Sequence, residues 1–128
     1  MNGKKVLLVD EEKSIRDTYS FLLSKEGYDV VTADNGKKAL EAMYHQHFDL
    51  VITDFAIRID GGCIVLDEVK TIFPTIPVMV FTDNATEIVR QFASLMGACA
   101  LIAKPCHYEF LIAHIRSLLT SNENRSSA

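Results

Sequence analysis

The sequence predicts an α/β fold in which five parallel strands alternate with five helices and form one doubly wound sheet. Short apolar runs alternate with amphipathic segments five times along the chain, and 128 residues is about the length of a single domain. Each parallel connection crosses over a face of the sheet with right-handed chirality, so the helices must cover both faces. The runs expected to be strands are Val6–Val9, Tyr28–Ala33, Leu50–Thr53, Pro77–Phe81 and Cys99–Ala103.

Helical spacing of apolar residues follows each of these runs. In the first helical segment Ile15, Tyr19, Leu22 and Leu23 recur at i, i+4, i+7 and i+8, and Gly27 follows as the expected stop. The later stripes are Leu40/Met43, Val65/Val69/Ile72/Phe73, Ile88/Phe92/Leu95/Met96 and Phe110/His114/Ile115/Leu118. We expect a folded domain over residues 4–120 and a disordered polar tail over residues 121–128, because that end holds only small and polar side chains.

Composition excludes several classes of protein. Hydrophobic residues make up 48% of the chain and charged residues 23%, which argues against intrinsic disorder. The apolar stretches fall far short of the roughly 20 residues that cross a bilayer, and no signal peptide is evident, so we expect a cytoplasmic protein without a membrane segment. A net charge of −4 disfavours direct nucleic-acid binding.

The cysteines and histidines show no spacing typical of a metal site. Cys63, Cys99 and Cys106 are odd in number, which favours free thiols, buried or partly buried, in a reducing compartment. His45 and His47 lie two residues apart and would point to different faces of a helix.

Polar residues follow four of the five expected strands. The first run ends in Asp10 and Glu11, the third in Asp54 and the fourth in Thr82, and Lys104 follows the fifth. In an open parallel sheet, ligands bind beyond the carboxyl ends of the strands. Carboxylates gathered there repel one another unless a cation intervenes, and hard oxygen ligands favour Mg²⁺. Lys104 and Thr82 add an ammonium and a hydroxyl suited to phosphoryl oxygens.

Four short motifs together resemble one known family. Val-Leu-Leu-Val-Asp10-Glu11-Glu12, Val-Ile-Thr-Asp54, Val-Phe-Thr82-Asp and Ala-Lys104-Pro105 occur in the order and at the intervals of the receiver domain of bacterial two-component response regulators. The resemblance covers about residues 4–120, and the motifs are specific in combination. It implies a flavodoxin-like (βα)5 fold with strand order 2-1-3-4-5, here as a stand-alone domain.

Carried over position by position, the resemblance implies a phosphoacceptor site that depends on Mg²⁺. Asp54 would accept the phosphoryl group from a sensor histidine kinase or a phosphotransfer protein, and Thr82 and Lys104 would hold the phosphoryl oxygens. The metal ligands would be Asp10, Glu11, Asp54 and the Ala56 carbonyl. The protein would be a signalling phosphoacceptor rather than a classical enzyme, with self-catalysed phosphotransfer and slow autodephosphorylation as its only chemistry.

The chain departs from the family pattern at several positions. Ile57-Arg58 replaces the usual Met-Pro, which removes a rigid turn and is expected to bring a cation near the site. Leu101 stands where the family usually has Tyr or Phe, and Ala98-Cys99-Ala100 replaces acidic residues expected at a dimer contact.

The resemblance also implies an output surface for a downstream target protein. It would consist of the fourth helix, the fifth strand and the fifth helix. The fourth helical segment carries two apolar stripes, Ile88/Phe92/Leu95 and Val89/Ala93/Met96, and we expect one of them to face the core and the other to be at least partly exposed.

Three other functions compete with this interpretation. A flavodoxin-like electron carrier would need small residues and free backbone N–H groups after the first strand, where Asp10-Glu11-Glu12 would repel phosphate. A phosphohydrolase with an aspartyl nucleophile would need a second acid two residues after Asp54, where Ala56 stands. The remaining alternative is a degenerate receiver that acts as a phosphorylation-independent binding scaffold, which Arg58 and Leu101 would favour.

Overall fold

The computed structural model describes residues 3–127, with side chains described as far as residue 120. It confirms the predicted sheet: five parallel strands in the order β2-β1-β3-β4-β5. The strands are β1 (Lys5–Val9), β2 (Asp29–Ala33), β3 (Leu50–Thr53), β4 (Val78–Thr82) and β5 (Ala100–Ala103). The helices are α1 (Lys13–Lys25), α2 (Gly36–His45), α3 (Val65–Ile72), α4 (Glu87–Leu95) and α5 (Tyr108–Ser127).

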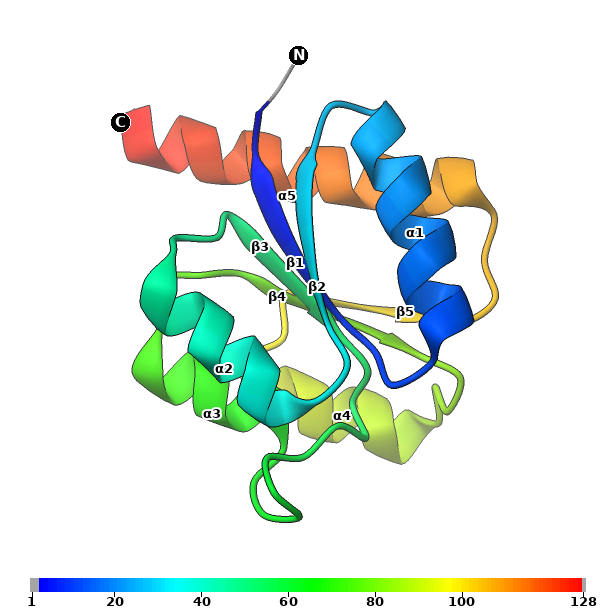
Figure 1. Cartoon of the computed structure of the whole chain (residues 1–128), viewed down its shortest axis with the longest axis vertical. Helices are drawn as coiled ribbons and strands as arrows, with labels where there is room; N and C mark the ends of the chain where they lie inside the picture. Colours follow the sequence, from blue (N-terminus) through cyan, green and yellow to red (C-terminus); the bar gives the residue numbers. More distant parts are fainter. Residues whose placement is uncertain (1–2, 128) are drawn as a thin grey trace.

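The sheet is the middle layer of three. Figure 1 shows α1 and α5 on one face and α2, α3 and α4 on the other. Successive side chains of β1 alternate between the two faces: Leu7 and Val9 pack with the α2–α4 layer, and Val6 and Leu8 pack with α1 and α5. Because each strand is covered on both sides, the strands read as apolar runs rather than as alternating patterns.

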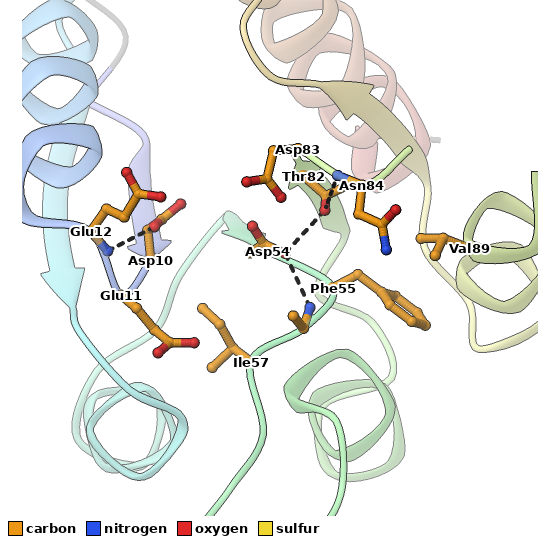
Figure 2. Close-up of a pocket in the computed structure, with 11 residues that line it drawn as sticks. Asp10, Glu11, Glu12, Asp54, Phe55, Ile57, Thr82, Asp83, Asn84 and Val89 are labelled. Atoms are coloured by element: carbon orange, nitrogen blue, oxygen red, sulfur yellow. Dashed lines mark hydrogen bonds between the residues drawn. The ribbon is translucent and has the colours of Figure 1, made fainter. Parts of the chain in front are cut away.

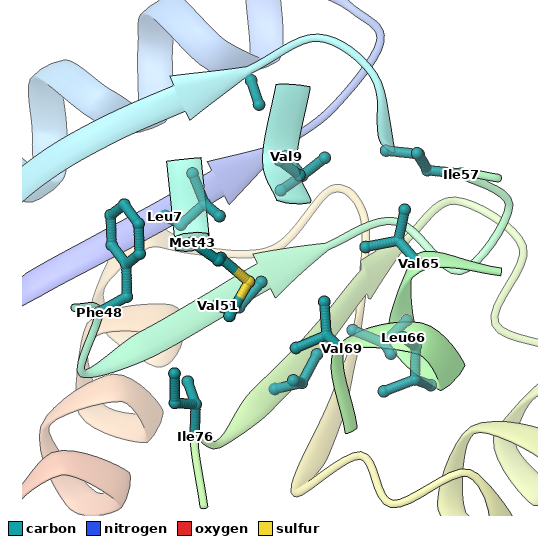
Figure 3. Packing of buried hydrophobic residues seen from close by; sticks show 14 of the residues in the cluster. Leu7, Val9, Met43, Phe48, Val51, Ile57, Val65, Leu66, Val69 and Ile76 are labelled. Carbon is teal, nitrogen blue, oxygen red and sulfur yellow. The ribbon is translucent and has the colours of Figure 1, made fainter. Parts of the chain in front are cut away.

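The larger core lies between the sheet and helices α2 and α3 (Figure 3). Gly36, the first residue of α2, is buried here, and a Cβ atom at this position would lie 2.7 Å from the carbonyl oxygen of Arg58. Only glycine therefore lets the loop after β3 pass against the start of α2. Asn35 caps the same helix by accepting a hydrogen bond of 2.9 Å from the Lys38 amide.

Helix α4 has two apolar stripes, and the structure shows which of them faces the core. The side chains of Ile88, Phe92 and Leu95 are 66%, 51% and 82% exposed. The other stripe faces the core, and Ala93 is its fully buried member. Both stripes are apolar, so the helical period alone could not decide which one the sheet covers.

The cysteines differ from one further expectation. Cys63 and Cys99 are exposed free thiols, and only Cys106 is partly buried.

The backbone of α5 continues to Ser127. No glycine or proline interrupts residues 108–127, so nothing in the sequence stops the helix. The boundary of the folded domain at residue 120, with the tail expected beyond it, stays a prediction.

None of the helices in residues 3–127 combines the length and the apolar composition that crossing a membrane requires.

Candidate functional site

The four polar strand ends named in the sequence analysis lie together at the carboxyl edge of the sheet. Asp10 follows β1, Asp54 follows β3, Thr82 is the last residue of β4, and Lys104 follows β5. Because β1, β3, β4 and β5 are consecutive neighbours in the sheet, side chains far apart in sequence become adjacent in space.

Lys104 connects the two aspartates. Its Nζ atom lies 2.7 Å from Asp10 Oδ2 and 2.9 Å from Asp54 Oδ2. All three side chains are largely shielded from water, with exposed fractions of 8%, 5% and 14%. Burial by itself lowers the pKa of Lys104, but hydrogen bonds to Asp10 and Asp54 and the charges of these carboxylates outweigh it, so the pKa lies above its ordinary value.

The second carboxylate oxygen of Asp54 accepts two hydrogen bonds. The Thr82 hydroxyl donates to Oδ1 at 3.1 Å, and the Ala56 amide donates to the same atom at 3.1 Å (Figure 2). The Thr82 hydroxyl oxygen in turn accepts a hydrogen bond of 3.2 Å from the backbone amide of Asn84. The Asp54 carboxylate is therefore oriented from both sides, and its contacts reach the loop that leads into α4.

The acidic loop after β1 is held by contacts to its own backbone. Asp10 Oδ1 accepts a hydrogen bond of 3.0 Å from the Glu12 amide. The guanidinium of Arg16, in α1, donates to the backbone carbonyls of Asp10 and Glu11 at 2.8 and 2.9 Å. No sequence motif indicated this role of Arg16, because a contact to backbone carbonyls leaves no pattern of residue types.

These residues surround a pocket of about 300 Å³. Figure 2 shows Glu11 at its rim, with its carboxylate beside Ile57 rather than beside Asp54. The lining residues are Asp10, Glu11, Glu12, Asp54, Phe55, Ala56, Ile57, Thr82, Asp83, Asn84 and Val89. The pocket is thus rich in carboxylates, and Lys104 is the cation that contacts two of them.

The donors around this pocket fit a hard divalent cation only in part. Among the residues that the structure describes, no three His, Cys, Asp or Glu side chains are placed to hold a metal ion. Asp10 and Asp54 share one ammonium and so lie close together, whereas Glu11 is exposed. Mg²⁺ is commonly bound by one or two carboxylates with most of its remaining ligands supplied by water, and Asp10 and Asp54 are the two carboxylates in this pocket that could serve.

Arg58 and Leu101, two departures from the family pattern, both lie outside the pocket. Arg58 was expected to bring a cation near Asp54, but its side chain donates to the Gly62 carbonyl at 3.0 Å within the loop that follows β3. Leu101 is half-buried against the core on the α2–α4 side of the sheet. The charge balance of the pocket is therefore set without Arg58.

Comparison with known families agrees with this geometry. Residues 6–116 match the model of the response regulator receiver domain. The chain therefore belongs to the receiver domain family of two-component response regulators, whose members are signalling phosphoacceptors rather than classical enzymes.

Solved structures give the same fold. A CheY-like receiver domain protein from Methanospirillum hungatei JF-1 has a TM-score of 0.88 at 24% identity, over 97% of this chain and 99% of that one. Chemotaxis protein CheY4 of Vibrio cholerae has a TM-score of 0.83 at 28% identity, over 91% and 98%. NtrX from Brucella abortus has a TM-score of 0.89 at 30% identity, covering 98% of this chain but 29% of NtrX.

Proposed function

We propose that Asp54 accepts a phosphoryl group from a phosphohistidine of a histidine kinase or phosphotransfer protein. One carboxylate oxygen of Asp54 attacks the phosphorus atom, the P–N bond breaks, and the imidazole leaves with the electron pair and is protonated. The product is an aspartyl phosphate. The observation that carries the proposal is the position of Asp54, whose two oxygens are held by Thr82, Lys104 and the Ala56 amide.

The side chains around Asp54 would act by position and charge. The Lys104 ammonium has three N–H groups, and two of them are engaged by Asp10 and Asp54, which leaves one for a phosphoryl oxygen. The Thr82 hydroxyl can donate to a second phosphoryl oxygen if it leaves Asp54. In phosphoryl transfer, such placement and neutralisation of charge account for most of the catalysis.

Mg²⁺ would be held by Asp10, Asp54 and the Ala56 carbonyl, with Glu11 acting from the rim. When bound, the ion neutralises the negative charge that the phosphoryl group brings to an already acidic pocket. Asp10 and Asp54 accept the bonds of Lys104 with their Oδ2 atoms, so the two carboxylates are already oriented toward a shared cation.

Intact mass tests the phosphoacceptor. Wild-type protein and Asp54→Asn are incubated with acetyl phosphate and Mg²⁺, and we expect about one added phosphoryl group in the wild type and none in the variant. Asp83→Asn, in the same pocket but without a contact to Lys104, is the matched control and should behave as the wild type. An equal adduct in Asp54→Asn would exclude Asp54 as the acceptor.

Thermal denaturation tests the metal. Mg²⁺ that binds the folded protein and not the unfolded chain raises the melting temperature by mass action, so we expect an increase at millimolar Mg²⁺ that Asp10→Asn largely abolishes. An unchanged melting temperature in the wild type, together with stabilisation by Glu11→Gln alone, would mean that the carboxylates of the pocket repel one another and that no metal binds there.

We also propose that a target protein docks on the face formed by α4, β5 and α5. Ile88, Phe92 and Leu95 are exposed there, and a cavity of about 450 Å³ between α4 and α5 is lined by Leu101 and Phe110 among others. Apolar side chains at such exposure mark interaction surfaces in soluble proteins.

The second candidate function, a phosphorylation-independent binding scaffold, is favoured by one observation. Leu101 lines the cavity on the proposed docking face. Its side chain has neither an aromatic ring nor a polar group. A scaffold would present that surface in every state of Asp54. Binding of a target with equal affinity to wild type and Asp54→Asn, in the presence of a phosphodonor, would support the scaffold over the switch.

A further inference from the structure

An aromatic ring lies beside the ammonium of Lys104, and the mechanism proposed above makes no use of it. Lys104 Nζ lies 5.6 Å from the centroid of the Phe81 ring, within the roughly 6 Å over which a cation is attracted to the π face. The Lys104 side chain is 8% exposed and Phe81 is 1% exposed. Because little water reaches the pair, the attraction is screened less than at a surface.

The ring of Phe81 is itself fixed by the core. Phe81 precedes Thr82 in β4 and points to the opposite face of the sheet, into the cluster that α1 and α5 cover. The ring of Tyr19, in α1, meets it edge-on, with centroids 5.0 Å apart and an interplanar angle of 81°. This is a favoured arrangement of aromatic pairs, so Phe81 cannot turn away from Lys104 without disturbing α1.

The contacts of Lys104 differ in how they respond to phosphorylation. Its bonds to Asp10 and Asp54 depend on carboxylate charge, and Asp54 loses its free carboxylate when it becomes an acyl phosphate. The contact with Phe81 involves an aromatic ring and no carboxylate. We propose that Phe81 is a positioning residue that holds the Lys104 ammonium at the acceptor site through its π face, before and after phosphoryl transfer. This inference rests on the proposed function of Asp54.

Fluorinated phenylalanines at position 81 test the proposal with little change of shape. Stepwise substitution with mono-, di- and trifluorophenylalanine withdraws electron density from the π face and weakens cation binding. We expect the rate of Asp54 phosphorylation, at saturating acetyl phosphate and Mg²⁺, to fall at each step and by roughly threefold or more over the series. Phe48, a fully buried ring in the other core, takes the same series as the matched control and should leave the rate unchanged.

A double-mutant cycle tests whether Phe81 acts through Lys104. Phe81→Leu keeps an apolar side chain but removes the ring, and we expect it to slow phosphorylation several-fold in the wild type and not at all in a Lys104→Met background. The proposal would be overturned by a phosphorylation rate that is insensitive to fluorination at position 81, or by an equal loss of rate in both backgrounds. Phe81 would then serve only in the packing of the core.

The same variants separate this inference from the proposed function. Because Lys104 Nζ lies 5.6 Å from the ring centroid, the NMR signals of the protons on the carbon next to Nζ should shift in Phe81→Leu without any phosphodonor present. If wild-type protein takes up no phosphoryl group, the proposed function fails, and an unchanged Lys104 signal in Phe81→Leu would then overturn the contact as well. If the wild type is phosphorylated normally and the fluorinated series has no effect, only the inference about Phe81 fails.

Discussion

Helix α3 follows β3, after which Asp54 stands, and helix α4 follows β4, which ends in Thr82, yet the two helices are attached to the sheet very differently. Helix α3 buries Val65, Leu66 and Val69 completely, whereas Ala93 is the fully buried residue of α4. Apolar burial stabilises by about 25 cal/mol per Å², and an alanine methyl contributes little area. Helix α4 is therefore the more weakly anchored of the two.

This difference places the more weakly anchored helix next to the proposed site. The loop between β4 and α4 begins at Thr82, whose hydroxyl contacts both Asp54 and the Asn84 amide. The loop after β3 is instead fixed by backbone bonds, such as that from the Val65 amide to the Ile57 carbonyl at 2.9 Å. A change at Asp54 is expected to move the α4 side, because segments with few buried contacts open most easily.

The largest expected effect comes from truncating the anchored helix. Leu66→Ala should lower the free energy of unfolding by about 2–5 kcal/mol, since it leaves a cavity in a packed core. Leu95→Ala, on the exposed face of α4, removes the same atoms and should change it by no more than about 0.5 kcal/mol. Urea denaturation measures both. Equal losses of unfolding free energy would show that the exposed stripe of α4 is covered in solution, and would contradict the weaker anchoring of α4.

A phosphoryl mimic tests whether a change at Asp54 affects α4 more than α3. We expect beryllofluoride with Mg²⁺ to shift backbone amide signals most at residues 82–90 and much less along α3. Leu101→Ala should leave this pattern largely intact, because Leu101 lies outside the pocket that Asp54 and Thr82 line. Loss of the shifts at residues 82–90 in Leu101→Ala, with the mimic still bound, would make Leu101 the coupling residue.

Helix α5 offers a third kind of attachment, with the smallest expected effect. The Tyr108 hydroxyl oxygen lies 2.9 Å from both the Leu22 carbonyl oxygen and Glu26 Oε1, and its one proton is shared between these two acceptors. Burial first, and then the hydrogen bond to Glu26 and its charge, raises the pKa of Tyr108 to about 12. Ionisation would remove the donor and place two negative charges together.

The pH dependence of stability follows from the direction of this shift. The folded state holds the Tyr108 proton more tightly than the unfolded chain, whose tyrosines titrate near pH 10. The contribution of Tyr108 is therefore complete below about pH 10 and is lost as the pH rises toward about 12. Urea denaturation at several pH values should show a steeper loss in the wild type than in Tyr108→Phe, and parallel curves would contradict the assignment.

The sequence by itself determined the sheet, its five strands to within one residue at each end, and the residues that gather at its carboxyl edge. It could do so because buried parallel strands require continuous apolar runs, and because every strand in such a sheet ends at the same edge. The positions of Asp10, Asp54, Thr82 and Lys104 at one edge follow from these two constraints.

Only the tertiary structure decided which apolar stripe of α4 faces the core, where Glu11 and Arg58 point, and what lies against Lys104. Both stripes of α4 are apolar, and the stripe that packs against the sheet is the one that contains the small residue Ala93. The contacts of Arg16 are made to backbone carbonyls five and six residues away and so depend on no particular residue types. The contact of Phe81 with Lys104 joins β4 to the segment that follows β5. Such contacts are set by the packing of whole elements, and local spacing of residue types carries no record of them.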